Sequence, residues 1–250
     1  MKDLQKDIKI LSDAYVLARV ATQRFIELAK KTILEKDFFT VALAGGHTPI
    51  TMYKLLASED YKNKIDWSKI NLFWSDERFV VHTDPESNFH SAYEALLKHV
   101  PVPAEHIHAI QSINISPEES AQKYQQEIVT VLGSNPRFDL ILLGIGSDGH
   151  TASLFPKSLQ DSNRNHGDLV ITVHNAPKNP PTRISFTFKL INAAAIVMFL
   201  VSGYQKASAL HEILDGKPNP TLYPAQSVHP VTGKLIWLVD EAAGSMLTAT

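Results

Sequence analysis

The stretch DLILLGIGSDGHTASLFP, residues 139–156, predicts a buried strand that runs into a glycine-rich turn. Its first half is almost wholly apolar, as in a strand covered on both faces. Three glycines then follow in the order G-x-G-x-x-G, beginning at Gly144, which is the spacing of the dinucleotide-binding fingerprint. That fingerprint needs a crossover helix after its last glycine. Pro156 leaves little room for such a helix, so the nucleotide interpretation is weak.

The turn also carries two polar side chains, Asp148 and His150. Histidine is well suited to exchange protons near neutral pH, and a turn at a strand end can direct it into a cleft. The alternative is a surface histidine, or one that caps the turn. The chain has 11 histidines, so most of them have no catalytic role. We expect His106 and His108 at the surface, because no acidic cluster nearby completes a metal site.

Short β-favouring runs alternate with helical stretches along the rest of the chain. Besides residues 138–144, the expected strands are residues 38–44, 69–75, 168–174, 183–188, 194–201 and 234–240, and the expected helices are residues 49–57, 88–97, 116–132 and 204–214. Ser116 and Glu119 form a capping box at the start of the third helix. This alternation predicts an α/β fold, a doubly wound, mostly parallel sheet with helices on both faces. Ligands of such sheets bind beyond the carboxyl ends of the strands.

The N-terminal segment has apolar residues at helical spacing from Ile8 through Leu11 to Ala29, which predicts one long amphipathic helix. The segment is charged throughout and has no apolar core of the signal-peptide type, so we expect the protein in the cytoplasm. The most apolar stretch, residues 193–201, is far shorter than the roughly 20 residues that span a bilayer.

The bulk composition indicates one domain over residues 1–250. The chain is 44% hydrophobic and 20% charged, with a formal net charge of −2. This balance provides no global basic field, so we expect neither a nucleic acid nor a membrane as partner. The chain has no cysteine, which excludes disulfides and thiolate chemistry.

The first expected strand of residues 38–44 leads into AGGHTP, residues 44–49. Gly45 and Gly46 form the turn, Thr48 stands at the expected N-cap, and Pro49 opens the helix. Exposed N–H groups at a helix N-terminus bind phosphate readily, and His47 could add a donor. A tight turn with a good cap explains the same residues equally well.

Charged residues follow two other strands and open a later helix. The second strand ends in three charged residues, Asp76, Glu77 and Arg78. They are either charges of a solvated loop or a group in which Arg78 donates to an oxyanion or a phosphate. Arg183 follows a Pro-rich loop, residues 175–183. Lys206 lies near a helix start, where an anionic ligand would relieve its conflict with the helix dipole, although an exposed lysine is the simpler interpretation.

Taken in order, these clusters resemble the 6-phosphogluconolactonase family, relatives of the glucosamine-6-phosphate isomerases and deaminases. The resemblance covers nearly the whole chain, and its most specific block is GIGSDGHTASLFP. The matching blocks are AGGHTP (44–49), SDERFV (75–80), SNFHSAYEALL (87–97), GIGSDGHTASLFP (144–156), PPTRISFTFKLINAA (180–194) and GYQKA (203–207). It implies a Rossmann-like fold of the glucosamine-6-phosphate isomerase type, with no nucleotide in the glycine-rich turn.

Two positions bear on the comparison with this family. Ala44 stands where the family usually has serine, so one side-chain donor to the phosphate is missing. Phe155 stands where the deaminases have a glutamate that takes part in ring opening. Because a phenyl ring cannot carry a proton, we favour the lactonase branch.

The resemblance implies hydrolysis of 6-phospho-D-glucono-1,5-lactone to 6-phosphogluconate, in the oxidative pentose phosphate pathway, with no metal or organic cofactor. It implies a general base, His150, held by Asp148, with Arg78 stabilising the oxyanion. The residues expected to bind the 6-phosphate are Gly45, Gly46, His47, Thr48, Arg183 and Lys206. Asp76 and Glu77 are expected to orient Arg78 or to contact sugar hydroxyls. The expected partner is this small phosphosugar lactone, bound by a monomer or a weak homodimer.

Three other functions remain open. A glucosamine-6-phosphate deaminase or related isomerase would use the same fold, and Phe155 argues against it. A non-catalytic phosphosugar-sensing domain would usually accompany a DNA-binding segment, for which the sequence before the first strand leaves no room. A nicotinamide-dependent enzyme lacks the helix expected after Gly149.

Overall fold

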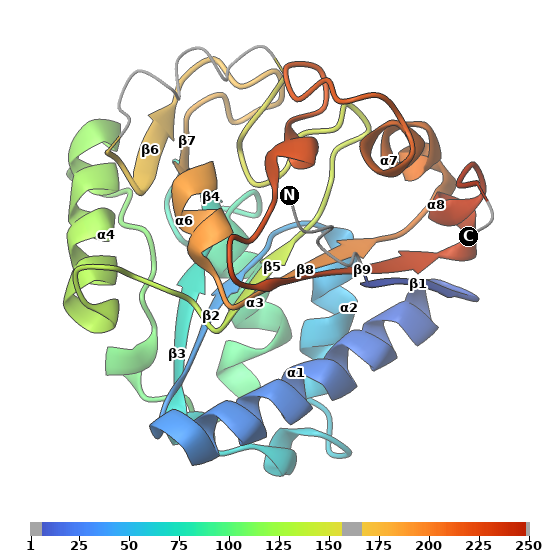
Figure 1. Ribbon diagram of the computed structural model, residues 1–250. Helices are drawn as coiled ribbons and strands as arrows, with labels where there is room; N and C mark the ends of the chain where they lie inside the picture. Colours follow the sequence, from blue (N-terminus) through green and yellow to red (C-terminus); the bar gives the residue numbers. More distant parts are fainter. Residues whose placement is uncertain (1–6, 157–166, 249–250) are drawn as a thin grey trace.

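The computed structural model describes residues 7–156 and 167–248 as an α/β fold built on two sheets (Figure 1). The larger sheet has six strands in the order β1-β9-β8-β5-β2-β3, and every pair of neighbours is parallel. Its strands are β1 (Asp7–Leu11), β2 (Phe39–Leu43), β3 (Ile70–Trp74), β5 (Leu140–Leu143), β8 (Ile196–Val201) and β9 (Lys234–Asp240). The predicted parallel sheet is therefore confirmed.

The smaller sheet is antiparallel, in the order β4-β7-β6. Its strands are β4 (Asp76–Arg78), β6 (Val170–Val173) and β7 (Arg183–Phe186). Residues 168–174 and 183–188 were predicted as strands, and they contain β6 and β7 of this antiparallel sheet. A parallel connection needs a crossover of about a dozen residues or more, usually a helix, whereas β6 and β7 are joined by a short Pro-rich loop.

Seven α-helices flank these sheets in the described residues. They are α1 (Ala14–Lys36), α2 (His47–Leu56), α3 (Asn88–Ala95), α4 (Pro117–Leu132), α6 (Phe188–Ala193), α7 (Ala207–Leu214) and α8 (Glu241–Gly244). Short 3₁₀ helices span Lys62–Lys64, Trp67–Lys69, Leu97–His99, Ala104–His106, Tyr204–Lys206 (η5) and Pro224–Ser227. Helix α1 packs beside α2, and α2 beside α3, whereas α4 covers β6 and β7 and α8 lies against β9 (Figure 1). None of the described helices has the length and apolar character to cross a membrane.

The predicted N-terminal helix begins later than expected. Residues 7–11 form β1, in which Ile8 pairs with Trp237 and Leu11 with Asp240. Helix α1 starts only after Asp13, whose Oδ1 accepts hydrogen bonds from Tyr15 and Val16 N–H, both at 2.8 Å. The N-cap separates β1 from α1, but the apolar residues of both segments share one helical spacing. The spacing alone therefore predicted a single helix.

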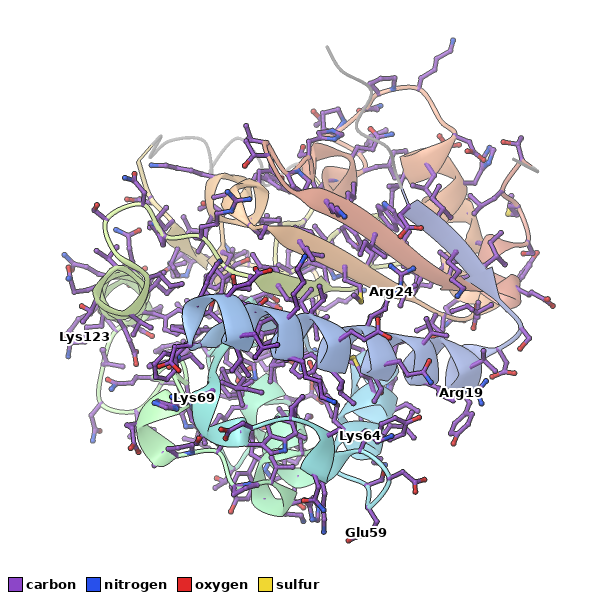
Figure 2. All side chains as sticks on the ribbon, turned by 60° about the horizontal axis from the view of Figure 1, so that its bottom comes forward. Arg19, Arg24, Glu59, Lys64, Lys69 and Lys123 are labelled. Atoms are coloured by element: carbon purple, nitrogen blue, oxygen red, sulfur yellow. The ribbon has the colours of Figure 1, made fainter. Side chains whose placement is uncertain are left out.

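An ion pair joins this strand to the helix that follows it. Arg24 on α1 reaches Asp7 on β1, with 3.0 Å between Nη1 and Oδ2. Figure 2 shows Arg24 and Arg19 on the helix where it passes the parallel sheet. Buried apolar residues between α1 and the sheet, Phe25 and Phe39 among them, belong to one core cluster that extends through the molecule.

Two further local predictions differ from the structure. Ser116 caps α4 through the Glu119 N–H at 3.2 Å, but the Glu119 carboxylate pairs with Lys123 at 3.0 Å, so the reciprocal half of the capping box is replaced by an ion pair. His108 was expected at the surface and is only 6% exposed.

The burial of His108 has a clear cause. A β-bridge between Ile107 and Leu72 draws this segment alongside β3. The His108 ring stacks on Phe73 with 4.2 Å between centroids, and its Nδ1 lies 2.7 Å from Glu127 Oε1. His106 is half-buried in its 3₁₀ helix. Neither histidine belongs to a metal-type cluster in the described part of the chain.

Candidate active site

A cavity of about 380 Å³ lies where the carboxyl ends of β2, β5 and β8 meet the antiparallel sheet. This is the edge at which the sequence predicted a ligand. The predicted site residues that line the cavity are Gly45, Gly46, His47, Thr48, Asp76, Arg78, His150, Arg183 and Lys206. Asp148 and Glu77 do not line it and instead contact residues that do.

The glycine turn after β2 presents the start of α2 to the cavity. Gly46 is the N-cap with a φ of 93°, and no side chain in the described part of the chain caps the first turn of the helix. The prediction that Thr48 is the N-cap was wrong, because the positive φ at Gly46 lets the helix begin at His47. Thr48 Oγ1 instead lies 2.7 Å from Ser202 Oγ, at the end of β8. The uncapped N–H groups remain available to an anion.

Gly45 lies in close contact with the Asn88 side chain. A Cβ at this position would lie 2.0 Å from Oδ1 of Asn88, the first residue of α3. Asn88 lines the cavity, and its Nδ2 donates to the Asp76 carbonyl at 2.9 Å. Sequence reasoning gave Asn88 no role, although it stands within a block that carried the resemblance.

The histidine of the second glycine-rich turn is held by a carboxylate. His150 Nδ1 lies 2.5 Å from Asp148 Oδ1, and the His150 ring lies 4.5 Å from the Phe155 ring. Gly146 makes room for this pair, since a Cβ there would lie 2.1 Å from both Asp148 Oδ1 and His150 Nδ1. No helix forms over residues 144–156, so the G-x-G-x-x-G spacing does not build a dinucleotide-binding turn here.

Electrostatics keep the Asp148 carboxyl of this pair ionised. Burial by itself raises the pKa of the Asp148 carboxyl, but the hydrogen bond from His150 and the charges of His150 and Lys178 outweigh it and lower the pKa to about 2. The carboxylate is therefore ionised at neutral pH and can only accept a hydrogen bond. Nδ1 of His150 is then the donor, which leaves Nε2 to accept a proton.

Glu77 is 1% exposed and does not line the cavity. Its carboxylate accepts from the N–H groups of Arg78 and Asn88, both at 2.7 Å, and from Phe89 N–H at 2.8 Å. Ser87 Oγ donates to it at 3.0 Å. Burial raises the pKa of Glu77, and these hydrogen bonds oppose that effect. Glu77 thus fixes the start of α3 against β4.

The other two residues of β4 face the cavity. Asp76 accepts a hydrogen bond from Ser153 Oγ through Oδ2, at 2.7 Å. Arg78 donates from Nη1 to the Glu86 carbonyl, while its buried Nε has no partner among the described residues. A buried donor without a partner is costly, so a bound acceptor near Arg78 would be favoured.

Arg183 is 4% exposed and lies opposite Arg78 in the register of β4 and β7. Its pKa is lowered by burial and by the charge of Arg78. Lys206 ends η5 just before α7, and its pKa is lowered by burial and by the charge of Lys178. Lys178 also lines the cavity. Sequence reasoning missed it, although the Pro-rich loop that carries it was noted.

Four cationic side chains of the described residues, from Arg78, Lys178, Arg183 and Lys206, therefore line the cavity, together with one carboxylate, that of Asp76. Like charges crowded around one cavity are stabilised by an anionic ligand. Fold and cavity together define an α/β protein with a cation-lined cavity at the carboxyl ends of its parallel strands, next to a histidine held by a carboxylate.

The chain belongs to the family of glucosamine-6-phosphate isomerases/6-phosphogluconolactonase, whose family model matches residues 12–237. This confirms the resemblance found in the sequence. A 6-phosphogluconolactonase of a Nostoc species is 38% identical over 98% of this chain and 100% of its own. One of a Synechocystis species is 43% identical over 87% of this chain and 88% of its own. The crystal structure of 6-phosphogluconolactonase from Thermotoga maritima is 32% identical and superposes with a TM-score of 0.82, covering 94% of this chain and 100% of that one.

Proposed function

We propose that this protein hydrolyses 6-phospho-D-glucono-1,5-lactone to 6-phosphogluconate, the lactonase step of the oxidative pentose phosphate pathway. The observation that carries the proposal is the Asp148–His150 pair, 2.5 Å between Oδ1 and Nδ1, at the wall of a cavity lined by four cations. The phosphate of the substrate matches the cations, and a general base accelerates the attack of water on the lactone. The relatives named 6-phosphogluconolactonase support the same assignment.

The first step is attack of water on the lactone carbonyl. His150 Nε2 takes a proton from the water as its oxygen bonds to the carbonyl carbon, and the carbonyl oxygen becomes an oxyanion. Asp148 holds Nδ1 and stabilises the imidazolium that forms. In the second step the C–O bond to the ring oxygen breaks and His150 returns its proton to that oxygen. The product is the open-chain acid, and the imidazole is restored.

Arg78 is the proposed oxyanion donor. A guanidinium stays charged, and an oxyanion donor contributes on the order of 3 kcal/mol to the transition state. Glu77 orients Arg78 through the Arg78 N–H at 2.7 Å, one of the two roles expected for it. Asp76 takes the other role, since its carboxylate lines the cavity and can accept from a sugar hydroxyl.

The phosphate end is proposed at the turns after β2 and β8, with Arg183 beside them. The backbone of Gly45 and Gly46, the uncapped start of α2 and the side chains of His47 and Thr48 supply donors without the family serine, replaced here by Ala44. Arg183 and Lys206 supply charge. Binding energy from the phosphate then places the carbonyl near the water.

The isomerase or deaminase reaction is less well supported. Phe155 lines the cavity beside His150, at 4.5 Å between ring centroids, where the deaminases are expected to have a proton-carrying glutamate. The sensing domain is also less well supported, since binding alone has no need for a histidine held in one tautomer.

The test is proton release from freshly generated 6-phosphogluconolactone, measured against the spontaneous rate. The wild type should accelerate it, and His150→Ala should lower kcat by about 10²-fold to 10⁴-fold, the usual contribution of a general base. Affinity for 6-phosphogluconate should change little, because His150 is not at the phosphate end. A His150→Ala variant with full turnover would refute the base assignment, and a wild type without acceleration would refute the lactonase.

A further inference from the structure

Lys178 is a cavity-lining cation for which the proposed mechanism has no role. It is an exposed residue of the loop between β6 and β7, and it lines the cavity. Among the described residues, no ion pair includes Lys178. An unpaired lysine at a cavity wall is available to a ligand.

The loop around Lys178 is held by Arg183. Arg183 Nε donates to the Pro180 carbonyl at 2.6 Å. Its Nη2 donates to the carbonyls of Lys178 at 3.1 Å and Asn179 at 3.2 Å. Ala176 N–H donates to the Pro181 carbonyl at 2.8 Å and closes the base of the loop. The buried guanidinium thus fixes three successive carbonyls, beginning at Lys178, which its planar fork of donors is suited to do.

Two charged groups lie near the Lys178 ammonium, one of each sign. The charge of Lys178 contributes to the low pKa of Asp148. It also repels the charge of Lys206 and thereby lowers the pKa of Lys206. Lys178 and Lys206 come from different turns, after β6 and after β8, and line the same cavity. A dianionic phosphate between them would relieve their repulsion, whereas a neutral ligand would not.

We propose that Lys178 is an additional phosphate-binding residue that acts with Lys206, and that Arg183 is the positioning residue that holds the Lys178 loop over the cavity. The inference rests on the proposed function for the identity of the substrate. It assigns Arg183 a role beyond direct contact with phosphate, since two of its three nitrogens are already used by the loop.

The experiment compares wild type with Lys178→Ala. We expect KM for 6-phosphogluconolactone to rise about tenfold, or about 1.4 kcal/mol, with kcat changed by less than about twofold. For D-glucono-1,5-lactone, which has no phosphate, the same substitution should leave kcat/KM unchanged. Lys217→Ala is the matched control, because Lys217 is an exposed lysine that does not line the cavity.

Other results would overturn the proposal. An unchanged KM in Lys178→Ala would remove Lys178 from the phosphate end. A fall in kcat alone, equal for both lactones, would show instead that Lys178 acts on the Asp148–His150 pair. Calorimetric titration with 6-phosphogluconate keeps the two proposals distinguishable, because weaker binding by Lys178→Ala would support this inference even if the wild type failed to hydrolyse the lactone.

The role of Arg183 is tested by combining substitutions. Arg183→Lys keeps a charge but loses the fork that holds three carbonyls. If Arg183 acts through Lys178, then Arg183→Lys should raise KM by a smaller factor in the Lys178→Ala background than in the wild type. Equal factors in the two backgrounds would refute the positioning role, with thermal unfolding of each variant showing that it is folded.

Discussion

At the scale of single residues, the geometry of the base depends on a position that carries no side chain. Gly146 has a φ outside the positive region, so its backbone conformation is open to any residue. What excludes a side chain is contact, because a Cβ would lie 2.1 Å from both atoms of the Asp148–His150 hydrogen bond. Both contacts are with side-chain atoms, which can move aside. A substitution there should displace the base and leave the fold intact.

We therefore expect Gly146→Ala to lower kcat by about 10²-fold, the usual effect of misplacing a catalytic group by about 1 Å. The thermal midpoint and the affinity for 6-phosphogluconate should change little. Gly144→Ala is the control on the same turn, since its Cβ would meet its nearest neighbour, the Leu200 carbonyl, at 3.8 Å. Steady-state kinetics of both variants decide the point, and equal activities in the two would contradict it.

At the scale of elements, Asp240 at the end of β9 connects the start of α8 to the turn after β8. Its carboxylate caps α8 through Ala243 N–H at 2.7 Å and accepts from Gly203 N–H at 3.0 Å. Gly203 has a φ of 93° and is the N-cap of the short η5 helix that ends at Lys206. Asp240 is 5% exposed, so no water can easily replace it. The position of Lys206 thus depends on a residue outside the cavity.

Asp240→Ala should lower the free energy of unfolding by about 1–2 kcal/mol through loss of the cap, and should also raise KM for the phosphorylated lactone. Asp240→Asn keeps one acceptor oxygen and should restore most of the KM. Chemical denaturation and kinetics on the same preparations provide the measurement. A destabilised Asp240→Ala variant with wild-type KM would show that the carboxylate is merely structural.

The elements also show what sequence patterns can predict. The apolar runs at residues 38–44 and 234–240 became β2 and β9, because a strand buried on both faces leaves a continuous apolar signature. The strand of residues 7–11 left no such signature. It lies at the sheet edge with mostly exposed side chains, and its apolar residues continue the spacing of α1. Its position depends on pairing with β9, more than 200 residues away along the chain.

The site was predictable to a similar extent and for a similar reason. His150 lies in the turn that follows β5, Arg78 comes shortly after β3, and Lys206 lies just before α7. A sequence displays such positions. Asn88 and Lys178 reach the cavity only because α3 packs over Gly45 and because Arg183 folds a loop inward. The first contact joins segments that are far apart in the sequence, and the second depends on side-chain geometry. A local sequence pattern predicts neither.

At the scale of the whole molecule, the charge of the cavity opposes that of the protein. The formal net charge is −2, yet four cationic side chains and one carboxylate line the cavity. An anionic substrate therefore gains nothing from the overall field, and its attraction comes from the cavity itself. This attraction acts over a short range. Salt should therefore weaken it by screening the partly exposed cations of the cavity, and not by reducing long-range steering.

We expect KM for 6-phosphogluconolactone to rise about threefold when ionic strength increases from about 0.01 M to about 0.15 M, which shortens the screening length from roughly 30 Å to roughly 8 Å. The kcat should stay constant, because the Asp148–His150 pair is hydrogen-bonded and partly shielded from salt. Neutral D-glucono-1,5-lactone is the internal control, since its kcat/KM should not respond. Lys178→Ala should respond less than the wild type, because one screened cation is gone. If both lactones responded to salt alike, the effect would lie in the protein's stability or in the base, and the cavity charges would have no special part in recognition.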